Sequence, residues 1–389
     1  MSSDGWKTFK LEEVAEIVGG GTPSTDNSDY WGGEIPWLTP RDLSTNEDRF
    51  VSHGERNITK LGLENSSAKL LPAGTILLTT RAPIGYLAIA SNPICTNQGF
   101  KSLIPNYQLV DGLFLYYLLR NNVEYLKSVG VGTTFAEISG GVLRRIEFDF
   151  PDLPIQRQIA EILSALDDKI ELNRQTNATL EAIAQAIFKE WFVDFNYPGA
   201  TGEMVESELG PIPKGWSVDN LRGFASVSSG KGLKRTEFTD EGYPILGANG
   251  QIGFTNNYLI DDEVILTGRV GTLGTLQLIN KKAWISDNVL IITPKEDFYY
   301  HYLYLWLKTV DFQNLNRGST QPLITKTDLL RLSILQPDVN ILIKYDRICR
   351  GLFNIITKYN NENALLSKIR DHLLPKLMNE QAELCCKFL

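Results

Sequence analysis

Residues 155–193 read IQRQIAEILSALDDKIELNRQTNATLEAIAQAIFKEWFV. Positions taken at alternating steps of four and three residues are apolar at eight of ten places. They are Ile159, Leu163, Leu166, Ile170, Asn173, Asn177, Leu180, Ala184, Ile187 and Trp191. This pattern predicts a long amphipathic helix that begins just after Pro154 and offers a seam to a partner helix.

A second stretch of the same kind runs from Ile341 to about Leu377. Its predicted seam is Tyr345, Ile348, Leu352, Ile355, Tyr359, Glu362, Leu366, Ile369 and Leu373. Each helix would be roughly 55–60 Å long at 1.5 Å per residue. The helices could pack separately on two domains, but two matched seams of equal length favour packing against each other. The Gly/Pro-containing linker 194–214 permits an antiparallel pair.

Polar residues interrupt both seams near their middle, at Asn173, Asn177 and Asn363. A buried asparagine weakens a seam but fixes its register, because a misaligned amide is left without a partner. We expect these three residues to set the axial alignment of the two helices.

The chain also repeats itself. Gly132 is echoed by Gly318, Ile138 by Ile324 and Asn177 by Asn363, always 186 residues later (318 − 132 = 186). Matched β-branched runs lie at 74–80 and 263–267, and again at 100–105 and 289–294. An aromatic helix pattern follows the runs at 100–105 and 289–294, and we interpret its aromatic residues as core residues. Such a duplication can build a pseudo-two-fold molecule.

The sequence therefore predicts an α+β fold in which two similar, β-rich globular domains are joined by an antiparallel two-helix coiled coil. The predicted boundaries are 1–154 for the first domain, 155–193 for the first helix, 194–214 for the linker, 215–338 for the second domain, 339–380 for the second helix and 381–389 for a tail.

Composition narrows the class of protein. The chain has 389 residues, 43% of them hydrophobic, and a net charge of −8. We find no membrane-spanning run and no signal peptide, and we expect a cytoplasmic protein with reduced cysteines. Methyltransferase, P-loop and metal-ligand motifs are not visible, so we expect no catalysis. The acidic charge predicts that any DNA binding shares its phosphate contacts with a basic partner.

An ordered, duplicated set of motifs carries a family resemblance. It consists of Gly5-Trp6, GPIPKGW at 210–216, the loops at 132–134 and 318–321, PIQRQI at 154–159 and AIFKEWF at 186–192. With these motifs the chain resembles, over nearly its whole length, the specificity subunit of type I restriction–modification systems. The second helix opens with Asp338-Val339-Asn340-Ile341 instead of the Gln-Arg form, which leaves open whether both helix starts contact a partner identically.

The resemblance implies a non-catalytic subunit with two target-recognition domains, each reading one half of a split, asymmetric site in double-stranded DNA. It implies that the helices also dock two methyltransferase subunits and that motor–nuclease subunits can join them. S-adenosylmethionine is expected on the methyltransferase, with no cofactor on this chain. Reading heads on one DNA face sit roughly 34–36 Å apart, which a helix pair of the predicted length can span. The alternative, which the acidic charge favours slightly, is a coiled-coil adaptor with two protein-binding heads and no DNA contact.

Candidate DNA contacts are polar and cationic residues on predicted loops, because arginine pairs with guanine and asparagine with adenine. In the first domain they are Arg41, Lys60, Arg81, Lys101 and Thr133. In the second they are Lys231, Lys234, Arg235, Asn249, Arg269 and Arg317. Arg81 and Arg269 occupy equivalent places, which suits a phosphate contact or a role in the fold better than base reading.

Arg235 provides a test of base reading. If Arg235 contacts a base edge, Arg235→Ala should relax sequence preference in one half-site by about 1–3 kcal/mol and leave the other half-site unchanged. The measurement is the methylated motif of cells that carry the variant. Equal weakening on all sequences would make Arg235 a phosphate contact.

Overall fold

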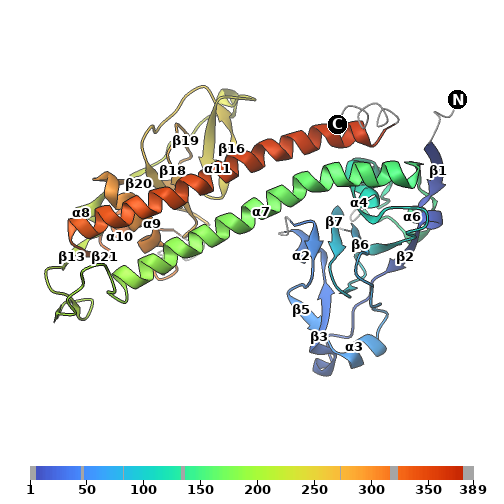
Figure 1. The fold of residues 1–389 in the computed structure, drawn as a ribbon, viewed down its shortest axis with the longest axis horizontal. Helices are drawn as coiled ribbons and strands as arrows, with labels where there is room; N and C mark the ends of the chain where they lie inside the picture. Colours follow the sequence, from blue (N-terminus) through green and yellow to red (C-terminus); the bar gives the residue numbers. More distant parts are fainter. Residues whose placement is uncertain are drawn as a thin grey trace. The chain divides into compact units, whose positions relative to one another are not determined.

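The computed structural model describes residues 6–44, 48–81, 83–132, 136–271, 273–315 and 323–379. The chain forms two compact units (Figure 1). The first unit contains Met1–Arg174 and Asn360–Leu389, and the second contains Gln175–Tyr359. Each unit therefore holds one globular part together with portions of the same two long helices. This arrangement confirms the predicted α+β repeat.

The two long helices are α7 (Leu153–Phe192) and α11 (Val339–Leu377), drawn in green and red in Figure 1. Pro154 lies inside the first turn of α7 and not before the helix. A proline is tolerated there because the first amide groups of a helix have no intrahelical acceptor. Pro375 lies in the last turn of α11.

The helices pack together in opposite directions. In the first unit Asn173 of α7 donates to Asn363 Oδ1 of α11 at 2.8 Å, and Arg370 Nη1 donates to Asp167 Oδ1 at 2.6 Å. In the second unit the rings of Phe192 and Tyr345 are 4.9 Å apart. Within the first unit, moving forward along α7 from Asp167 to Asn173 corresponds to moving backward along α11. The predicted antiparallel packing is confirmed.

The predicted seam of the first helix is confirmed at its fully buried positions. These are Ile159, Leu163, Ile170, Asn173 and Ala184. Phe188 and Phe192 are also buried, although neither belongs to the predicted seam. Both join an aromatic cluster in the second unit, where the Phe192 ring lies 4.8 Å from that of Tyr302.

The predicted seam of the second helix is wrong at Ile348, Ile355 and Ile369, whereas Glu362 is partly covered and accepts a hydrogen bond from Asn173. Ile348, Ile355 and Ile369 are 38%, 41% and 39% exposed. The covered positions come one residue later, at Cys349, Ile356, Asn363 and Arg370. From Tyr345 the covered positions follow at steps of four and then three residues. The prediction used a step of three first and then four. Because Ile348 and Cys349 are both apolar, as are Ile355 and Ile356, periodicity alone does not choose between them.

The described residues of the first globular part form three sheets. Strand β1 (Trp6–Lys10) pairs with β10 (Glu147–Pro151). A five-stranded sheet has the order β2 (Ala15–Gly19), β9 (Lys101–Pro105), β6 (Ile76–Thr80), β7 (Ile84–Ala90) and β4 (Phe50–Val51). A three-stranded sheet has the order β5 (Arg56–Ile58), β3 (Trp31–Leu38) and β8 (Cys95–Thr96). The helices are α1 (Leu11–Val14), α2 (Pro40–Ser44), α3 (Lys60–Glu64), α4 (Gly112–Asn121), α5 (Val123–Val129) and α6 (Gly140–Arg145), with a 3-10 turn η1 (Ser28–Tyr30).

The second unit repeats this topology. Strand β13 (Ser217–Asn220) pairs with β21 (Ser333–Gln336). The larger sheet has the order β14 (Ala225–Ser229), β20 (Val289–Pro294), β17 (Val264–Gly268) and β18 (Leu276–Ile279). The smaller sheet has the order β16 (Gly250–Thr255), β15 (Tyr243–Gly247) and β19 (Trp284–Ile285), and a hairpin of β11 (Met204–Val205) and β12 (Ile212–Pro213) precedes both. The remaining elements are α8 (Leu221–Phe224), α9 (Tyr300–Leu307), α10 (Lys326–Leu330), η2 (Arg235–Glu237) and η3 (Asp297–Tyr299).

The two copies match strand by strand. The order β2-β9-β6-β7 corresponds to β14-β20-β17-β18, and each three-stranded sheet contains one antiparallel and one parallel pair. The predicted strand pairs are confirmed as β6 with β17 and β9 with β20. The aromatic residues of α4 and α9 are mostly buried, which confirms that they are core residues.

Asn173 makes the register hypothesis testable. It is 1% exposed, and its amide nitrogen donates to Asn363 and to Glu362 Oε2 at 2.9 Å. Asn173→Ala leaves these acceptors without that donor, and we expect the free energy of unfolding to fall by about 1–3 kcal/mol. The measurement is urea unfolding followed by circular dichroism.

The matched control replaces Asn173 and Asn363 together with leucine. This double variant should recover the lost stability, because an apolar pair replaces the amide pair, and should show mixed oligomeric states by light scattering. A single variant as stable as the parent, or a double variant in one homogeneous state, would contradict the register role.

Candidate nucleic-acid interface

Two of the predicted cations in the first unit meet at one carboxylate. Arg81 directly follows β6, and Lys101 begins β9, the neighbouring strand. Glu137 lies between them, with 4.0 Å from its Oε2 to Arg81 Nε and 4.0 Å from its Oε1 to Lys101 Nζ. Distances this long give weak ion pairs. The Arg81 side chain is half exposed and available to an external anion, whereas the Lys101 side chain is only 19% exposed. Thr133 lies outside the described residues.

Arg41 and Lys60 lie apart from this cluster, at opposite ends of the three-stranded sheet β5-β3-β8. Arg41 belongs to α2, which follows β3, and Lys60 begins α3, which follows β5. Because β3 and β5 are antiparallel, these two connections leave the sheet at different ends. Both side chains are exposed, and the 3.8 Å contact of Lys60 with Glu64 is a surface pair that contributes little to stability.

Arg56 is a candidate that sequence reasoning missed. Its guanidinium carbon lies 3.5 Å from the ring centroid of Trp31, which in turn packs edge-on against Trp37 at 5.0 Å. Stacking on an indole restricts the arginine to few conformations while its N–H groups stay available. The available sequence signal was the pair of tryptophans, Trp31 and Trp37. Their spacing does not indicate that Arg56 lies beside them.

In the second unit, the segment that carries Lys231, Lys234 and Arg235 crosses the three-stranded sheet β16-β15-β19. At one edge the Lys231 amide donates to Ile285 O of β19 at 2.8 Å. At the other edge the Thr239 amide donates to Phe254 O of β16 at 2.9 Å. All three cations are exposed. The main chain is therefore held at both ends while the charged side chains face solvent.

Asn249 joins this group, because it lies in the turn between β15 and β16 and is exposed. The structure thus brings four of the six second-unit candidates to one small sheet. Arg269 is elsewhere: it follows β17, its amide donates to Asn288 O at 2.8 Å, and its carbonyl accepts from Ile324 N at 3.1 Å. Arg317 lies outside the described residues.

The charge around these cations is balanced. Between residues 231 and 241 the three cations are matched by Glu237, Asp240 and Glu241. A surface of this kind can choose among bases but supplies little net attraction for phosphates. The balance agrees with the acidic charge of the whole chain.

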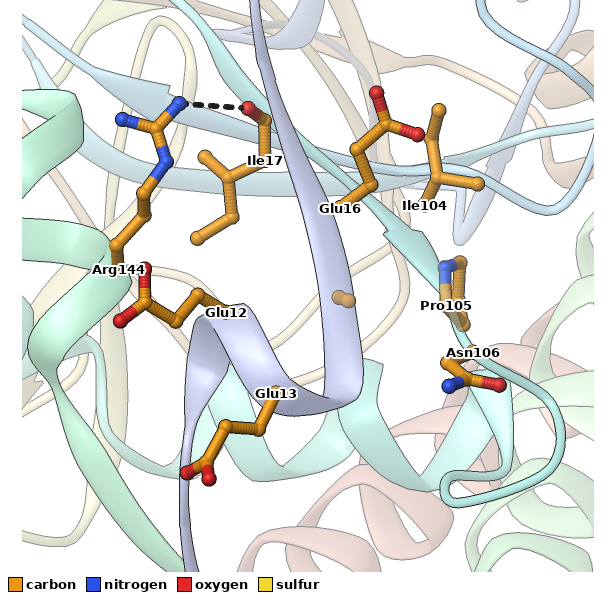
Figure 2. Close-up of a pocket in the computed structure, with 9 residues that line it drawn as sticks. Glu12, Glu13, Glu16, Ile17, Ile104, Pro105, Asn106 and Arg144 are labelled. Atoms are coloured by element: carbon orange, nitrogen blue, oxygen red, sulfur yellow. Dashed lines mark hydrogen bonds between the residues drawn. The ribbon is translucent and has the colours of Figure 1, made fainter.

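A pocket in the first unit has the wrong sign for a phosphate. Glu12, Glu13 and Glu16 line it, together with Arg144 (Figure 2). Figure 2 shows Arg144 reaching across to the main chain of β2, where its Nη2 donates to Ile17 O at 3.3 Å. Because this single cation is engaged with the fold, the three carboxylates dominate the pocket and would repel DNA.

A charged network fixes the first globular part to the helices. Arg49 Nη1 donates to the Tyr117 hydroxyl at 2.9 Å, and that hydroxyl donates to Asp167 Oδ2 at 2.6 Å. Arg370 of α11 binds the second oxygen of Asp167. Burial, together with the nearby Asp167, raises the pKa of the Tyr117 phenol, so the hydroxyl remains a donor.

A different network serves the second unit. His301 Nδ1 lies 2.7 Å from Asp346 Oδ1, and Arg350 Nε donates to the other oxygen of Asp346 at 2.6 Å. Arg350 also binds both carboxylate oxygens of Glu263 at 2.8 Å, which raises the pKa of its guanidinium. The pseudo-repeat therefore attaches its two globular parts to the helices through unlike residues.

Among the described residues no group of three or more His, Cys, Asp or Glu side chains could hold a metal ion. Cys95 and Cys349 are buried free thiols, and burial raises their pKa to about 11 and about 12. Within the same part of the chain, no helix is long and apolar enough to cross a membrane.

The arrangement of the chain matches known proteins. The family model for the type I restriction modification DNA specificity domain matches twice, at residues 3–182 and 213–371. The chain is 36% identical to the type I restriction enzyme MjaIX specificity subunit of Methanocaldococcus jannaschii over 96% of this chain and 92% of that protein. It is 26% identical to the HindI specificity subunit of Haemophilus influenzae over 96% and 99%.

A solved structure shares the fold. The S subunit of a type I restriction–modification system from M. genitalium aligns with a TM-score of 0.63 at 18% identity, over 98% of each chain. The two family matches fall on the two copies of the repeat, and each continues into a long helix. The chain therefore belongs to the family of type I restriction–modification DNA specificity subunits.

Proposed function

We propose that this chain reads a split DNA target, one half-site with each unit, and recruits methyltransferase subunits through its helix pair. The observation that carries the proposal is the repeat itself. Both units use the same strand order, but the connections that bear the candidate contacts differ between them. A common scaffold with unlike loops suits two half-sites of unlike sequence.

The charge distribution supports a shared interface with DNA. Candidate cations of both units lie next to carboxylates, and the whole chain carries a net charge of −8. Sequence preference would come from this chain, and a methyltransferase partner would add phosphate contacts. The proposal assigns methyl transfer and the S-adenosylmethionine site to that partner, and motor–nuclease subunits would join the same core.

A direct test compares the chain alone with the chain co-expressed with its methyltransferase subunit. We expect sequence-specific gel shifts that are much stronger for the complex, because the partner supplies phosphate contacts. Methylome sequencing should give one split motif. A complex that forms but shows no sequence preference would favour the protein-binding adaptor, and methyl transfer by the purified chain alone would refute the non-catalytic role.

An apolar stripe on α11 supports recruitment of a partner. Ile348 and Ile355 of the second unit lie seven residues apart and are 38% and 41% exposed. Residues seven apart lie on the same side of a helix. Large apolar side chains in such a row indicate a surface that is covered in an assembly. We assign this surface to a methyltransferase subunit.

Ile355→Asp tests this assignment. A charge placed on the stripe should weaken the complex with the methyltransferase at least tenfold, because the carboxylate loses water on binding, while the fold is unchanged. Asn361→Asp adds the same charge at an exposed position off the stripe and should bind normally. Pull-down and analytical ultracentrifugation measure the effect, and equal affinity of the two variants would exclude the stripe as the docking surface.

A further inference from the structure

The hairpin of β15 and β16 in the second unit is held in a fixed shape. Ala248 and Asn249 alone separate the strands, and Gly247 pairs with Gly250, whose φ of +111° favours glycine. The Gln277 side chain reaches over from β18 in the larger sheet. Its Nε2 donates to the carbonyl oxygens of Gly247 at 2.9 Å and Ala248 at 3.0 Å. The end of the hairpin is therefore pinned from a second sheet.

A β-bulge interrupts the pairing of β16 at Ile252. Ile245 pairs with Gly253, but Leu246 pairs with Gln251, so Ile252 is an extra residue without a partner on β15. A regular strand alternates its side chains between two faces, and the extra residue shifts this alternation at Ile252, which is exposed. Bulges of this kind redirect side chains, often next to functional sites.

Ile252 presents most of its side chain to solvent. It is 56% exposed. Its side chain lies across β15, where a Cβ on Gly247 would come within 3.3 Å of Ile252 Cγ2. The glycine thus leaves room for the isoleucine to rest on the hairpin while most of its apolar surface remains uncovered.

The hairpin is flanked by the cation-bearing segment described above. That segment is bound to β19 through the Lys231 amide and to β16 through the Thr239 amide. The major groove of B-DNA admits a two-stranded β-ribbon, and cations beside such a ribbon can contact the phosphates that border the groove. Because three carboxylates balance the three cations of this segment, the surroundings of Ile252 suit the reading of base edges better than net attraction of phosphates.

The first unit has a different connection at this place. Residues 39–55 lie between β3 and β5, the strands that correspond to β15 and β16, and they include α2 and β4. The tight two-residue hairpin is thus particular to the second unit, although the pairing of β3 with β5 also shifts register. A reading element found in one unit alone would act on one half-site alone.

We infer that Ile252 contacts the 5-methyl group of a thymine in the major groove of the half-site read by the second unit. The inference rests on the proposed function and adds a residue and a base to it. An apolar side chain on a rigid ribbon distinguishes thymine from other bases through that methyl group, the one apolar substituent on a major-groove base edge.

The test uses the complex of the full chain with its methyltransferase and a duplex that carries its methylated motif. Each thymine of the motif is replaced in turn by deoxyuridine, which lacks only the methyl group. For the parent chain, one replacement in one half-site should weaken binding about fourfold, the effect of one methyl-sized apolar contact. For Ile252→Ala that replacement should have no effect, and the sensitivity at all other thymines should be unchanged.

Two variants make the result specific. Ile252→Val keeps a branched apolar side chain and should retain the response to deoxyuridine, which excludes a folding defect. Leu61→Ala removes a comparably exposed side chain (47%) from the first unit and should respond like the parent.

Several outcomes would overturn the inference while leaving the proposed function intact. They are a motif in which the half read by the second unit lacks any A·T pair, a parent complex insensitive to every deoxyuridine, and an Ile252→Ala complex that keeps the parent's response. A complex with no sequence preference at all would instead refute the proposed function.

Discussion

A helix of about forty residues with one apolar stripe needs a surface to cover that stripe, since its own hydrogen bonds do not hold it in water. In this chain each long helix is covered by the other and by the globular parts. The helix that leaves the first globular part runs into the second unit, and the helix that leaves the second globular part returns to the first. The two copies of the repeat are therefore interdependent, and both depend on the contact between α7 and α11.

Local periodicity was enough to predict the helices, the duplicated strands and the buried seam of α7. It did not fix the seam of α11, because isoleucine or cysteine stands at two consecutive positions, at 348 and 349 and again at 355 and 356. The seam of α11 is fixed by Asn363 and Arg370, which contact Asn173 and Asp167 of α7. Pairs of this kind lie about 200 residues apart in the chain, so no local pattern shows them.

The candidate interface was predictable only in part, because local patterns are visible in the sequence and contacts between distant residues are not. Exposed cations on loops could be picked out one by one, and the second unit does gather several of them on one sheet. The stacking of Arg56 on Trp31 depends on the pairing of β3 with β5. The exposure of Ile252 depends on a bulge, which shifts a side chain without any change in the hydrophobic pattern. Neither arrangement can be derived from residue spacing.

The exchange of helices between the copies has a consequence for how the protein is made. Leu374 and Leu377 of α11 belong to the same core as Leu11 and Phe114 of the first unit. These leucines leave the ribosome after every residue of the second unit. The first globular part therefore cannot complete its core while the second unit is being translated, and part of that core stays exposed to water. The core of the first globular part is completed only when synthesis is nearly finished, and the nascent chain carries an uncovered apolar surface until then.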